Sequence, residues 1–345
     1  MEQMTLEEIQ QLPKAELHVH LDGSIRAETL LDLAKKQNID LPFSDIPSLR
    51  KYLNVGKVVA DLEAYIKRFD IVLSVLQTEN ALFRTAFELA EEASKENIRL
   101  LEIRFSPILH TKKGLNLETI MDATIEGLRA AENQYNIRTG VIVCGIRHMD
   151  PETSLQLAEL TVAYKNRGAI GFDLAGAEYN YPAKHHVEAF YTIRNNNINC
   201  TVHAGEAFGP KSVHQAIHYL GAHRIGHGTH LIEDMDLMDY VNDHRIALEI
   251  CLSSNLQTGS IQSLHNHPLR RFLDYGLRVT LNTDNRLFSD TTVSKEILLA
   301  QKTFNLTERE IKKIVMFGFK SAFMHYRERK KLLLWAADEL HTSCL

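Results

Sequence analysis

Residues 200–228 read CTVHAGEAFGPKSVHQAIHYLGAHRIGHG. Two short runs with the residue types of β-strands, Cys200–His203 and Arg224–Gly226, lie at the two ends of this stretch. Between them, Ser212 is a candidate N-cap for a helix that Gly221 would end. A strand, a helix and a second strand in this order are typical of two parallel strands joined by a helical crossover.

The same alternation of short strands and helices continues in both directions along the chain. Six further runs predict strands: Leu17–Leu21, Leu100–Phe105, Gly140–Ile146, Ile170–Leu174, Ala247–Leu252 and Arg278–Leu281. Several of the eight runs are mainly apolar, as expected of parallel strands that are covered on both faces. Eight strands, each followed by a helix, predict an α/β fold, a closed (β/α)8 barrel of the TIM type. An open doubly wound sheet is the alternative, but the sequence contains no glycine-rich phosphate-binding fingerprint to favour it.

Three regions are longer than this simple repeat requires. Thr5–Glu8 predicts a capping box and a short helix before the first strand. The segment 26–97 is too long for a loop between a strand and a helix, and its Leu and Phe residues have helical spacing. Because it leaves the C-terminal end of the first strand, where barrel active sites form, we expect a helical lid. Residues 294–339 predict helices over the outside of the barrel, so residues 1–345 are expected to form one domain.

The composition favours a globular protein that acts on a small molecule. Of the 345 residues, 44% are hydrophobic and 24% are charged, and the formal net charge of −5 would not attract nucleic acid or an anionic membrane. No apolar run approaches the ~20 residues that span a bilayer, and the acidic N-terminal stretch lacks the apolar core of a signal peptide. We expect a reduced, cytoplasmic protein, because no paired spacing relates the four cysteines, Cys144, Cys200, Cys251 and Cys344.

Histidines at the end of the first predicted strand suggest a metal site. The stretch Glu16-Leu-His-Val-His-Leu-Asp-Gly-Ser24 contains His18 and His20, which project to the same face because side chains alternate along a strand. Two imidazoles that point into the mouth of a barrel would supply half of a zinc site. The same spacing recurs at His265 and His267, but a proline follows and no strand is predicted there. We therefore interpret the second pair as loop surface.

Other polar side chains lie at the ends of three further strands. His203 ends the fifth strand and Glu206 follows it, His227 lies between two glycines at the end of the sixth, and Asp284 follows the eighth. Each has an ordinary structural alternative, such as a buried histidine bonded to a carbonyl group or an aspartate that caps a helix. The C-terminal ends of barrel strands open on one rim, so we expect these side chains to converge there.

The motifs HVHLDGS, HAGE, RIGHG, CLSSN and NTD together resemble those of the adenosine deaminase family, within the amidohydrolase-type barrels. They occur in the family's order between residues 16 and 285, which is nearly the whole predicted barrel. The resemblance implies a hydrolase that replaces the exocyclic amine of a purine nucleoside by a carbonyl oxygen. It implies one zinc ion, held by His18, His20, His203 and Asp284. Relatives with two metal ions need a lysine at the end of the fourth strand, where this chain has Ala175-Gly176-Ala177-Glu178.

The resemblance also implies how the remaining rim residues act. Glu206 would protonate ring nitrogen 1 of the purine, and His227 would orient and stabilise the attacking hydroxide. Asp284 would accept the proton of the water as well as bind the metal. The residues in contact with the substrate would be His20, Asp22, Gly176 and Asn285.

The residues implied for substrate binding favour adenosine. Asp22 would bind a ribose hydroxyl and the backbone of Gly176 the purine edge, whereas relatives that act on the free base tend to have glutamate in place of Asp22. Many relatives have a second aspartate where Asn285 stands, and an amide can donate a hydrogen bond there without being protonated. We expect deamination of adenosine and 2'-deoxyadenosine to inosine compounds and ammonia in purine salvage. Adenine, an N6-substituted AMP or another adenosine-containing metabolite stays open as the substrate.

Other motifs and other classes of protein have to be weighed against this interpretation. His214 and His218 have the spacing of a zinc-protease pair, but Gln215 stands where such an enzyme needs glutamate, so we interpret them as structural. Ser253 and Ser254 lack a nucleophile elbow and are interpreted as support for the site. A non-catalytic zinc barrel, or a hydrolase of esters or lactams that would need the missing lysine, stays open. The ligand set suits zinc but also iron or cobalt, and the oligomeric state stays open.

Overall fold

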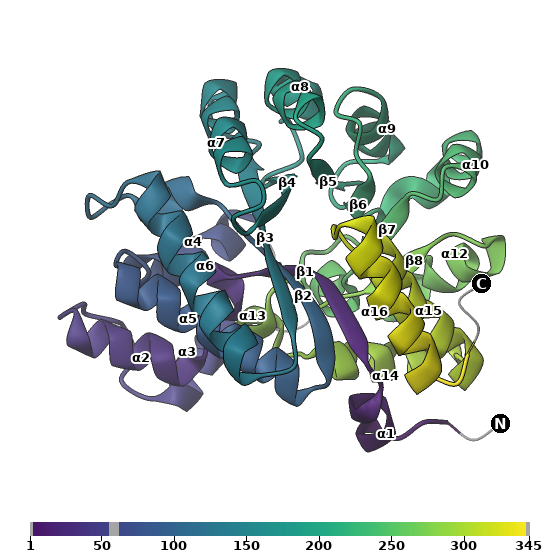
Figure 1. Cartoon of the computed structure of the whole chain (residues 1–345), viewed down its shortest axis with the longest axis horizontal. Coiled ribbons are helices and arrows are strands. Elements are labelled where there is room, and N and C mark those ends of the chain that lie inside the picture. The colour runs from purple at the N-terminus through teal and green to yellow at the C-terminus, as the bar shows by residue number, and fades with distance from the viewer. Residues whose placement is uncertain (1–2, 55–61, 343–345) are drawn as a thin grey trace.

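The computed structural model of the chain describes residues 3–54 and 62–342. Eight parallel strands form one sheet in which each strand pairs with the next along the chain. The strands are β1 (Lys14–His20), β2 (Ile98–Phe105), β3 (Arg138–Ile146), β4 (Ala169–Ala175), β5 (Asn199–Ala204), β6 (Arg224–His227), β7 (Ala247–Ile250) and β8 (Val279–Leu281). Helices surround this sheet (Figure 1), so the predicted (β/α)8 barrel is confirmed.

The contact that closes the sheet joins β1 to the residues that follow β8. Val19 and Asp284 form a parallel β-bridge. The backbone N–H of His20 donates to the carbonyl of Asp284 at 2.7 Å, and the N–H of Asp284 donates to the carbonyl of His18 at 2.9 Å. Closure of the barrel therefore places the histidines of the first strand beside the aspartate that follows the last one.

Helices connect the strands and cover the outside of the barrel. The α-helices are α1 (Leu6–Gln11), α2 (Ala27–Lys36), α3 (Ile46–Leu53), α4 (Leu62–Val75), α5 (Glu79–Lys95), α6 (Leu117–Gln134), α7 (Pro151–Ala163), α8 (Val187–Asn195), α9 (Pro210–His218), α10 (Met235–Asp243), α11 (Leu252–Gln257), α12 (Leu269–Tyr275), α13 (Arg286–Ser289), α14 (Val293–Phe304), α15 (Glu308–Ser321) and α16 (Tyr326–Glu339). Short 3-10 turns are η1 (Asp22–Ser24), η2 (Pro107–His110), η3 (Ala183–His186), η4 (Thr229–Glu233) and η5 (Leu264–Asn266). Of the C-terminal helices, α15 packs against β1 and β8, and α16 packs against α15.

The segment 26–97, interpreted as a lid, contains four helices in its described part, and residues 55–61 lie outside the described residues. Directly after β1, η1 contacts α4 and α13, and α3 contacts α13. The ring of Phe69 in α4 stacks on that of Phe288 in α13, with centroids 4.5 Å apart. The last helix of the segment, α5, packs instead against β2 and α6, as a barrel helix does. The helices that contact the turns after β1 and β8 are therefore α3 and α4, and α2 packs against both of them.

Local capping signals predicted one helix start correctly and another incorrectly. The predicted capping box at Thr5–Glu8 is present at the start of α1. The predicted N-cap Ser212 is wrong, because α9 begins two residues earlier at Pro210 and Ser212 is buried in its first turn. Proline is favourable at the first helical position, where its fixed φ suits the helix and no N–H partner is needed. Gly221 lies just past α9 with φ +69°, so the predicted end of the helix is close to the observed one.

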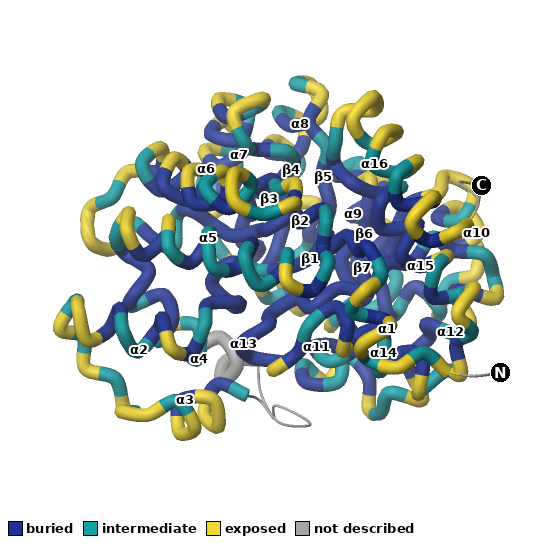
Figure 2. The backbone as a smooth tube through the Cα atoms, turned by 60° about the horizontal axis from the view of Figure 1, so that its bottom comes forward, coloured by how far each residue is buried: buried dark blue, intermediate teal, exposed yellow. Residues whose placement is uncertain are grey.

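The strands form the buried centre of the molecule, and exposed backbone lies mainly on the surrounding helices (Figure 2). Every residue of β6, β7 and β8 is buried. The buried strands also contain charged side chains: Glu16, Glu102, Arg104, Asp173, Arg224 and Glu249. Because a buried charge is costly unless it is paired, these residues indicate a polar network inside the barrel.

The thiols and the helix lengths bear on the expected cellular setting. Cys144, Cys200 and Cys251 are buried free thiols, and Cys344 lies outside the described residues. Burial raises the pKa of the Cys200 thiol to about 12, which makes it unreactive. Among the helices of residues 3–54 and 62–342, none is long and apolar enough to cross a bilayer.

Candidate active site

Four side chains from three parts of the barrel come together in one cluster at its mouth. They are His18 and His20 of β1, His203 of β5 and Asp284 after β8, and one candidate ligand atom of each lies within 4.8 Å of the others. The Nε2 atoms of His20 and His203 are 3.2 Å apart. The Nε2 atoms of His18 and His20 are each 3.3 Å from Oδ1 of Asp284. The structure thus brings together the four residues that the family resemblance implies as metal ligands.

The chemistry and the spacing of this cluster fit a metal ion. Nε2 of His18 is buried and makes no hydrogen bond within the described part of the chain. In a tetrahedral zinc site with bonds of ~2.1 Å, neighbouring ligand atoms lie about 3.4 Å apart, close to the separations seen here. Imidazole nitrogens and a carboxylate oxygen are ligands that zinc takes. His18, His20, His203 and Asp284 therefore fit as the holders of one divalent cation.

Two buried carboxylates bind the outer ring nitrogens of two of these histidines. Nδ1 of His18 donates to Oε2 of Glu249 at 3.0 Å, and Nδ1 of His203 donates to Oδ2 of Asp173 at 2.9 Å. A neutral ring with its proton on Nδ1 presents the lone pair of Nε2 to the cluster, as a metal ligand must. Burial lowers the pKa of His18 to about 4, which keeps this ring neutral and available to a cation.

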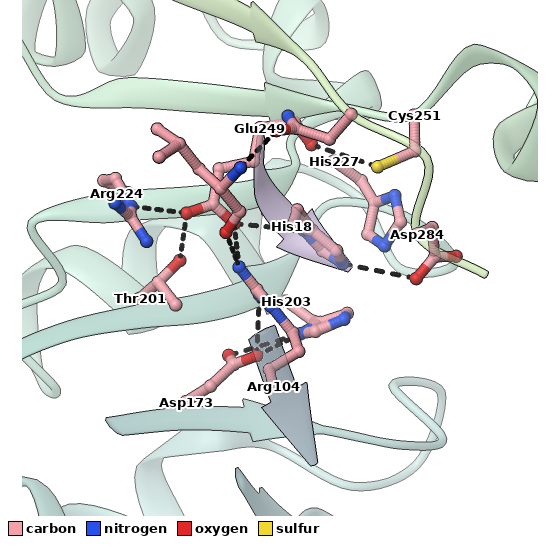
Figure 3. A network of polar contacts seen from close by, with 12 residues as sticks. His18, Arg104, Asp173, Thr201, His203, Arg224, His227, Glu249, Cys251 and Asp284 are labelled. Carbon is pink, nitrogen blue, oxygen red and sulfur yellow. Dashed lines mark hydrogen bonds and ion pairs between the residues drawn. The ribbon is translucent and has the colours of Figure 1, made fainter. Parts of the chain in front are cut away.

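Two arginines inside the barrel compensate these carboxylates (Figure 3). Arg104 of β2 donates from Nη1 to Asp173 at 2.8 Å and from Nη2 to Glu249 at 2.9 Å, and all three side chains are fully buried. Nε of Arg224 in β6 lies 2.5 Å from Oε1 of Glu249. Burial would raise the pKa of Glu249, but Arg104 and Arg224 outweigh it and hold that pKa far below its ordinary value. Both carboxylates therefore stay ionised and keep the protons of their histidines on Nδ1.

Sequence reasoning missed this network of Arg104, Asp173, Arg224 and Glu249. The sequence did contain a feature that indicates such a network. Each of these charged residues belongs to a short, otherwise mainly apolar run that was predicted as a strand. Such a charge stays in a barrel interior only when it is paired. A charge within an apolar strand therefore indicates a buried partner, although it does not say which residue that partner is.

The backbone at two site residues has an unusual conformation. His227 and Asp284, which follow or end β6 and β8, both have φ +63°. Residues other than glycine rarely adopt this left-handed conformation, which persists where the surrounding structure holds it and is common at functional sites. Gly226, directly before His227, has no side chain because a neighbouring ring needs the space. A Cβ there would lie 3.1 Å from Cε1 of His18, so the glycine leaves room for that imidazole.

Glu206 lies just beyond β5 and next to His227. Its Oε2 atom is 3.6 Å from Nε2 of His227, and its Oε1 atom accepts a hydrogen bond from the hydroxyl of Thr258 at 3.0 Å. The ring of His227 lies beside the rings of His18 and His203, with centroids 4.9 and 5.2 Å away. The side chain of Glu206 is 21% exposed, whereas that of His227 is 1% exposed. A partly exposed carboxyl group therefore stands beside the cluster, accessible to a molecule that enters from the rim.

Glu178 holds the loop that carries Glu206. Its two carboxylate oxygens accept four consecutive backbone N–H groups at 2.6 to 3.0 Å, those of Gly205, Glu206, Ala207 and Phe208. The residue is buried and lies three residues after the end of β4. Sequence reasoning missed this contact and noted the position only because no lysine occurs there. Four donors on one carboxylate fix the backbone after β5, so Glu178 is a positioning residue for Glu206.

Replacing Glu178 by Gln is expected to lower kcat on the order of tenfold while the metal content is unchanged. An amide nitrogen in place of one oxygen would face a backbone N–H, and a buried donor left without an acceptor costs ~1–3 kcal/mol. Steady-state kinetics together with metal analysis of the purified variant measures this effect. Glu188→Gln, at an exposed position of α8, is the matched control and should leave kcat unchanged. Equal kcat values in the two variants would contradict the positioning role.

The residues expected to contact the substrate lie at the ends of three strands. Asp22 is in η1 after β1, and burial raises its pKa to about 6. Asn285 follows the last strand, and its side chain lies against the backbone of Gly23, where a Cβ would overlap it. Gly176 directly follows β4 with φ +94°, a conformation that favours glycine. The three positions lie at the C-terminal rim, as expected.

The two serines of the CLSSN motif take part in supporting hydrogen bonds, which agrees with their interpretation. The hydroxyl of Ser254 donates to Oδ2 of Asp284 at 2.6 Å. The hydroxyl of Ser253 donates to the carboxylate of Glu296. Because Ser254 occupies Oδ2, the other carboxylate oxygen of Asp284 is the one that faces the histidines.

One interpretation of the remaining histidines is wrong. His267 is not loop surface, because it is 3% exposed and both of its ring nitrogens are hydrogen-bonded. It comes directly before α12, which packs against β8, so its position at the start of that helix carries the ring inward. His265 is exposed, as expected. His214 and His218 are exposed on α9, outside the metal cluster.

The fold and the site together define a class of protein. A closed parallel barrel carries three histidines and an aspartate at the C-terminal rim, with a further carboxyl group and imidazole beside them. Active sites of such barrels lie at this rim, and a divalent cation held there activates water for hydrolysis. The class is therefore that of the metal-dependent hydrolase barrels.

Comparison with known proteins gives the family. The family model described as adenosine deaminase matches residues 13–338. Over 322 residues the chain is 44% identical to a probable adenosine deaminase of Dictyostelium discoideum, covering 93% of this chain and 42% of that protein. Over 348 residues it is 39% identical to the adenosine deaminase of Mycobacteroides abscessus, covering 96% of each. The chain belongs to the adenosine deaminase family, and it is a hydrolase that deaminates at a carbon–nitrogen bond.

Solved structures of related deaminases share the whole barrel. The adenine deaminase of Arthrobacter aurescens superposes with a TM-score of 0.88 at 26% identity, covering 96% of this chain and 98% of that chain. The N6-mAMP deaminase of Arabidopsis gives a TM-score of 0.85 at 27% identity, covering 96% and 99%. Because these two proteins are named for different aminopurines, the fold by itself does not identify the substrate.

Proposed function

We propose that this chain catalyses the hydrolytic deamination of adenosine to inosine and ammonia, and of 2'-deoxyadenosine to 2'-deoxyinosine and ammonia, in purine salvage. The observation that carries the proposal is the cluster of three histidines and an aspartate with Glu206 and His227 beside it. The family membership of the chain supports the same reaction, because relatives at 39% identity over nearly their full length are named adenosine deaminase.

The metal of this reaction is proposed to be one zinc ion held by His18, His20, His203 and Asp284. Zinc in such a site lowers the pKa of a bound water to roughly 7 and so supplies a nucleophile at neutral pH. The histidine nitrogens are prepared for this task by Glu249 and Asp173, which accept the Nδ1 protons of His18 and His203. Ser254, which donates to Oδ2 of Asp284, keeps the other oxygen directed at the cluster.

Proton transfers are assigned to two carboxyl groups. Carbon 6 of the purine is a poor electrophile, and protonation of ring nitrogen 1 by Glu206 makes it more electron-poor. Asp284 accepts a proton from the attacking water and passes it to the amine, which leaves as ammonia. The remaining hydroxyl proton returns to Glu206 as the carbonyl forms. His227 lies between Glu206 and the cluster, where its Nε2 can stabilise the attacking oxygen. The net reaction adds one water and releases one ammonia.

The substrate is held, in this proposal, by residues around the same rim. Buried Asp22 offers a carboxyl group to a ribose hydroxyl, and desolvation of that group leaves it in need of such a hydrogen bond. The backbone of Gly176 approaches the purine edge, and His20 lies beside the bound base. Asn285 donates from its amide to the purine ring without requiring a protonated acid. A nucleoside therefore meets more of these groups than a free base would.

The helices α2, α3 and α4 are proposed to form the lid over this site within a single catalytic domain that comprises residues 1–345. The contact of α4 with η1, which contains Asp22, and that of α3 with α13, which follows Asn285, support that role, and α2 packs against α3 and α4. We further propose a cytoplasmic enzyme whose partner is a purine nucleoside rather than nucleic acid or a membrane. The net charge of −5 and the buried thiols support this setting.

A substrate panel tests the function. Conversion to the 6-oxo product is measured side by side for adenosine, 2'-deoxyadenosine, adenine, AMP and N6-methyl-AMP on purified protein, with metal analysis of the same sample. The first four substrates release ammonia, whereas N6-methyl-AMP releases methylamine. We expect kcat/KM for the two nucleosides to exceed that for the others, with about one zinc per chain. A preference for adenine or N6-methyl-AMP would select the alternative aminopurine substrate instead. A metal-loaded protein that converts none of the five to a 6-oxo product would point to the non-catalytic barrel.

A further inference from the structure

A chain of hydrogen bonds behind His227 ends on a backbone amide. The N–H of Leu269 donates to Nδ1 of His267 at 3.0 Å. Nε2 of His267 is 3.3 Å from Oδ1 of Asn255, and Nδ2 of Asn255 is 3.0 Å from Nδ1 of His227. Asn255 is fully buried in α11, and the two histidines are 3% exposed or less. Neither Asn255 nor His267 has a role in the mechanism described above.

The direction of each hydrogen bond can be worked out from the backbone amide. An N–H group only donates, so Nδ1 of His267 accepts and carries no proton. Burial lowers the pKa of His267 to about 3, so the ring is neutral and its single proton is on Nε2. That Nε2–H donates to Asn255, and the oxygen of a carboxamide is the atom that accepts. The oxygen of Asn255 therefore faces His267, and its NH2 group faces His227.

The orientation of Asn255 determines which nitrogen of His227 is protonated. An NH2 group only donates, so Nδ1 of His227 must accept and cannot carry a proton. The tautomer that fits this contact carries its proton on Nε2, the nitrogen that is 3.6 Å from Oε2 of Glu206.

We propose that Asn255 and His267 are positioning residues that hold His227 in the Nε2–H tautomer, so that His227 donates a hydrogen bond to the attacking oxygen and does not accept a proton from it. The inference rests on the proposed place of His227 beside the reacting atoms. The two residues then have different roles: Asp284 accepts a proton from the attacking water, and His227 stabilises the attacking oxygen. A base at His227 would need the opposite tautomer, with a lone pair on Nε2.

The tautomer is measured directly by long-range 1H–15N NMR of the metal-loaded protein labelled with 15N-histidine, with His227→Gln used to assign the signals. We expect Nδ1 of His227 to be unprotonated and Nε2 to be protonated. In Asn255→Asp, a carboxylate that only accepts replaces the amide, and we expect Nδ1 of His227 to become protonated. A protonated Nδ1 in the wild type, or an unchanged spectrum in a folded Asn255→Asp, would overturn the proposal.

Two substitutions at the far end of the chain keep the test independent of whether Asn255→Asp folds. His267→Gln retains an N–H donor for Asn255 and should keep kcat within about threefold, whereas His267→Phe leaves the amide free to turn and should lower kcat about tenfold. KM should change little in either variant. His265→Phe, the same substitution at the exposed neighbour in η5, is the matched control.

The outcomes separate this proposal from the proposed function. Equal kcat values for His267→Phe and His267→Gln would overturn the positioning role even if adenosine is turned over as expected. The NMR signals need no turnover, so a protein that deaminates none of the substrates still reports the tautomer of His227. If none of the substrates is converted but the NMR spectrum is as expected, the proposed function is wrong and the proposed tautomer of His227 is still supported.

Discussion

Replacing Glu206 by Gln is expected to lower kcat for adenosine by ~100- to 10,000-fold, the usual range for loss of a general acid. Glutamine keeps the size of the side chain and can still donate a hydrogen bond to ring nitrogen 1, but it cannot transfer a proton. KM should therefore change little. Glu206 is not one of the four residues of the metal cluster, so the zinc content should equal that of the wild type.

Ammonia release and metal analysis on the same preparation check this prediction. Glu233→Gln is the matched control, because Glu233 lies on η4, the turn after β6, and its side chain is 54% exposed. The control should leave both kcat and metal content unchanged. Full activity in a zinc-loaded Glu206→Gln protein would remove the general acid from the mechanism and would favour another route for protonation of the base.

Replacing Arg104 by Met is expected to destabilise the fold by roughly 3–5 kcal/mol, the usual cost of removing one partner from a buried ion pair. The methionine fills a similar length of the barrel but leaves Asp173 and Glu249 without the guanidinium that both of them bind. The same loss disturbs the carboxylates that orient His18 and His203. Metal affinity should therefore also fall, by about 10- to 100-fold.

Urea unfolding of the metal-free proteins measures the change in the free energy of unfolding, and titration with zinc measures the change in zinc affinity. Arg167→Met is the matched control, since Arg167 makes a surface ion pair with Asp122 at 3.4 Å and both side chains are at least half exposed. Breaking such a pair is expected to cost less than about 1 kcal/mol. A loss in Arg104→Met no larger than that in Arg167→Met would show that the buried network does not stabilise the barrel.

The strands and the four-residue cluster could be predicted because their signals are local. A run such as Ala247–Leu252 is apolar apart from Glu249 over the length of one strand, and the alternation of side chains along β1 places His18 and His20 on one face. Parallel barrels open all their strand ends on one rim, so the residue that follows each strand could be assigned to the same place. Helix starts were harder to predict, because Ser212 is a residue type favoured at an N-cap, whereas α9 begins at Pro210.

The network behind the site could not be predicted in the same way. Arg104 reaches Asp173 and Glu249, which are 69 and 145 residues away in sequence. His267 was interpreted as loop surface because a proline follows it and no strand is predicted there, yet its ring bonds to Asn255 inside the protein. Which charge or amide meets which partner depends on the register and packing of several strands and helices, and no short stretch of sequence contains that information.

The amino-acid sequence by itself determined the eight-stranded barrel, the rim on which its polar residues gather, and the likeness to a family of deaminases. The tertiary structure alone decided how the ring closes through Val19 and Asp284, which carboxylates orient the histidines, and which atom of Asn255 faces His227. The physical reason is the distance along the sequence between the residues that interact. Periodicity and strand ends arise from neighbours a few residues apart, whereas the protonation and orientation of a buried side chain are determined by partners that meet only when the barrel closes.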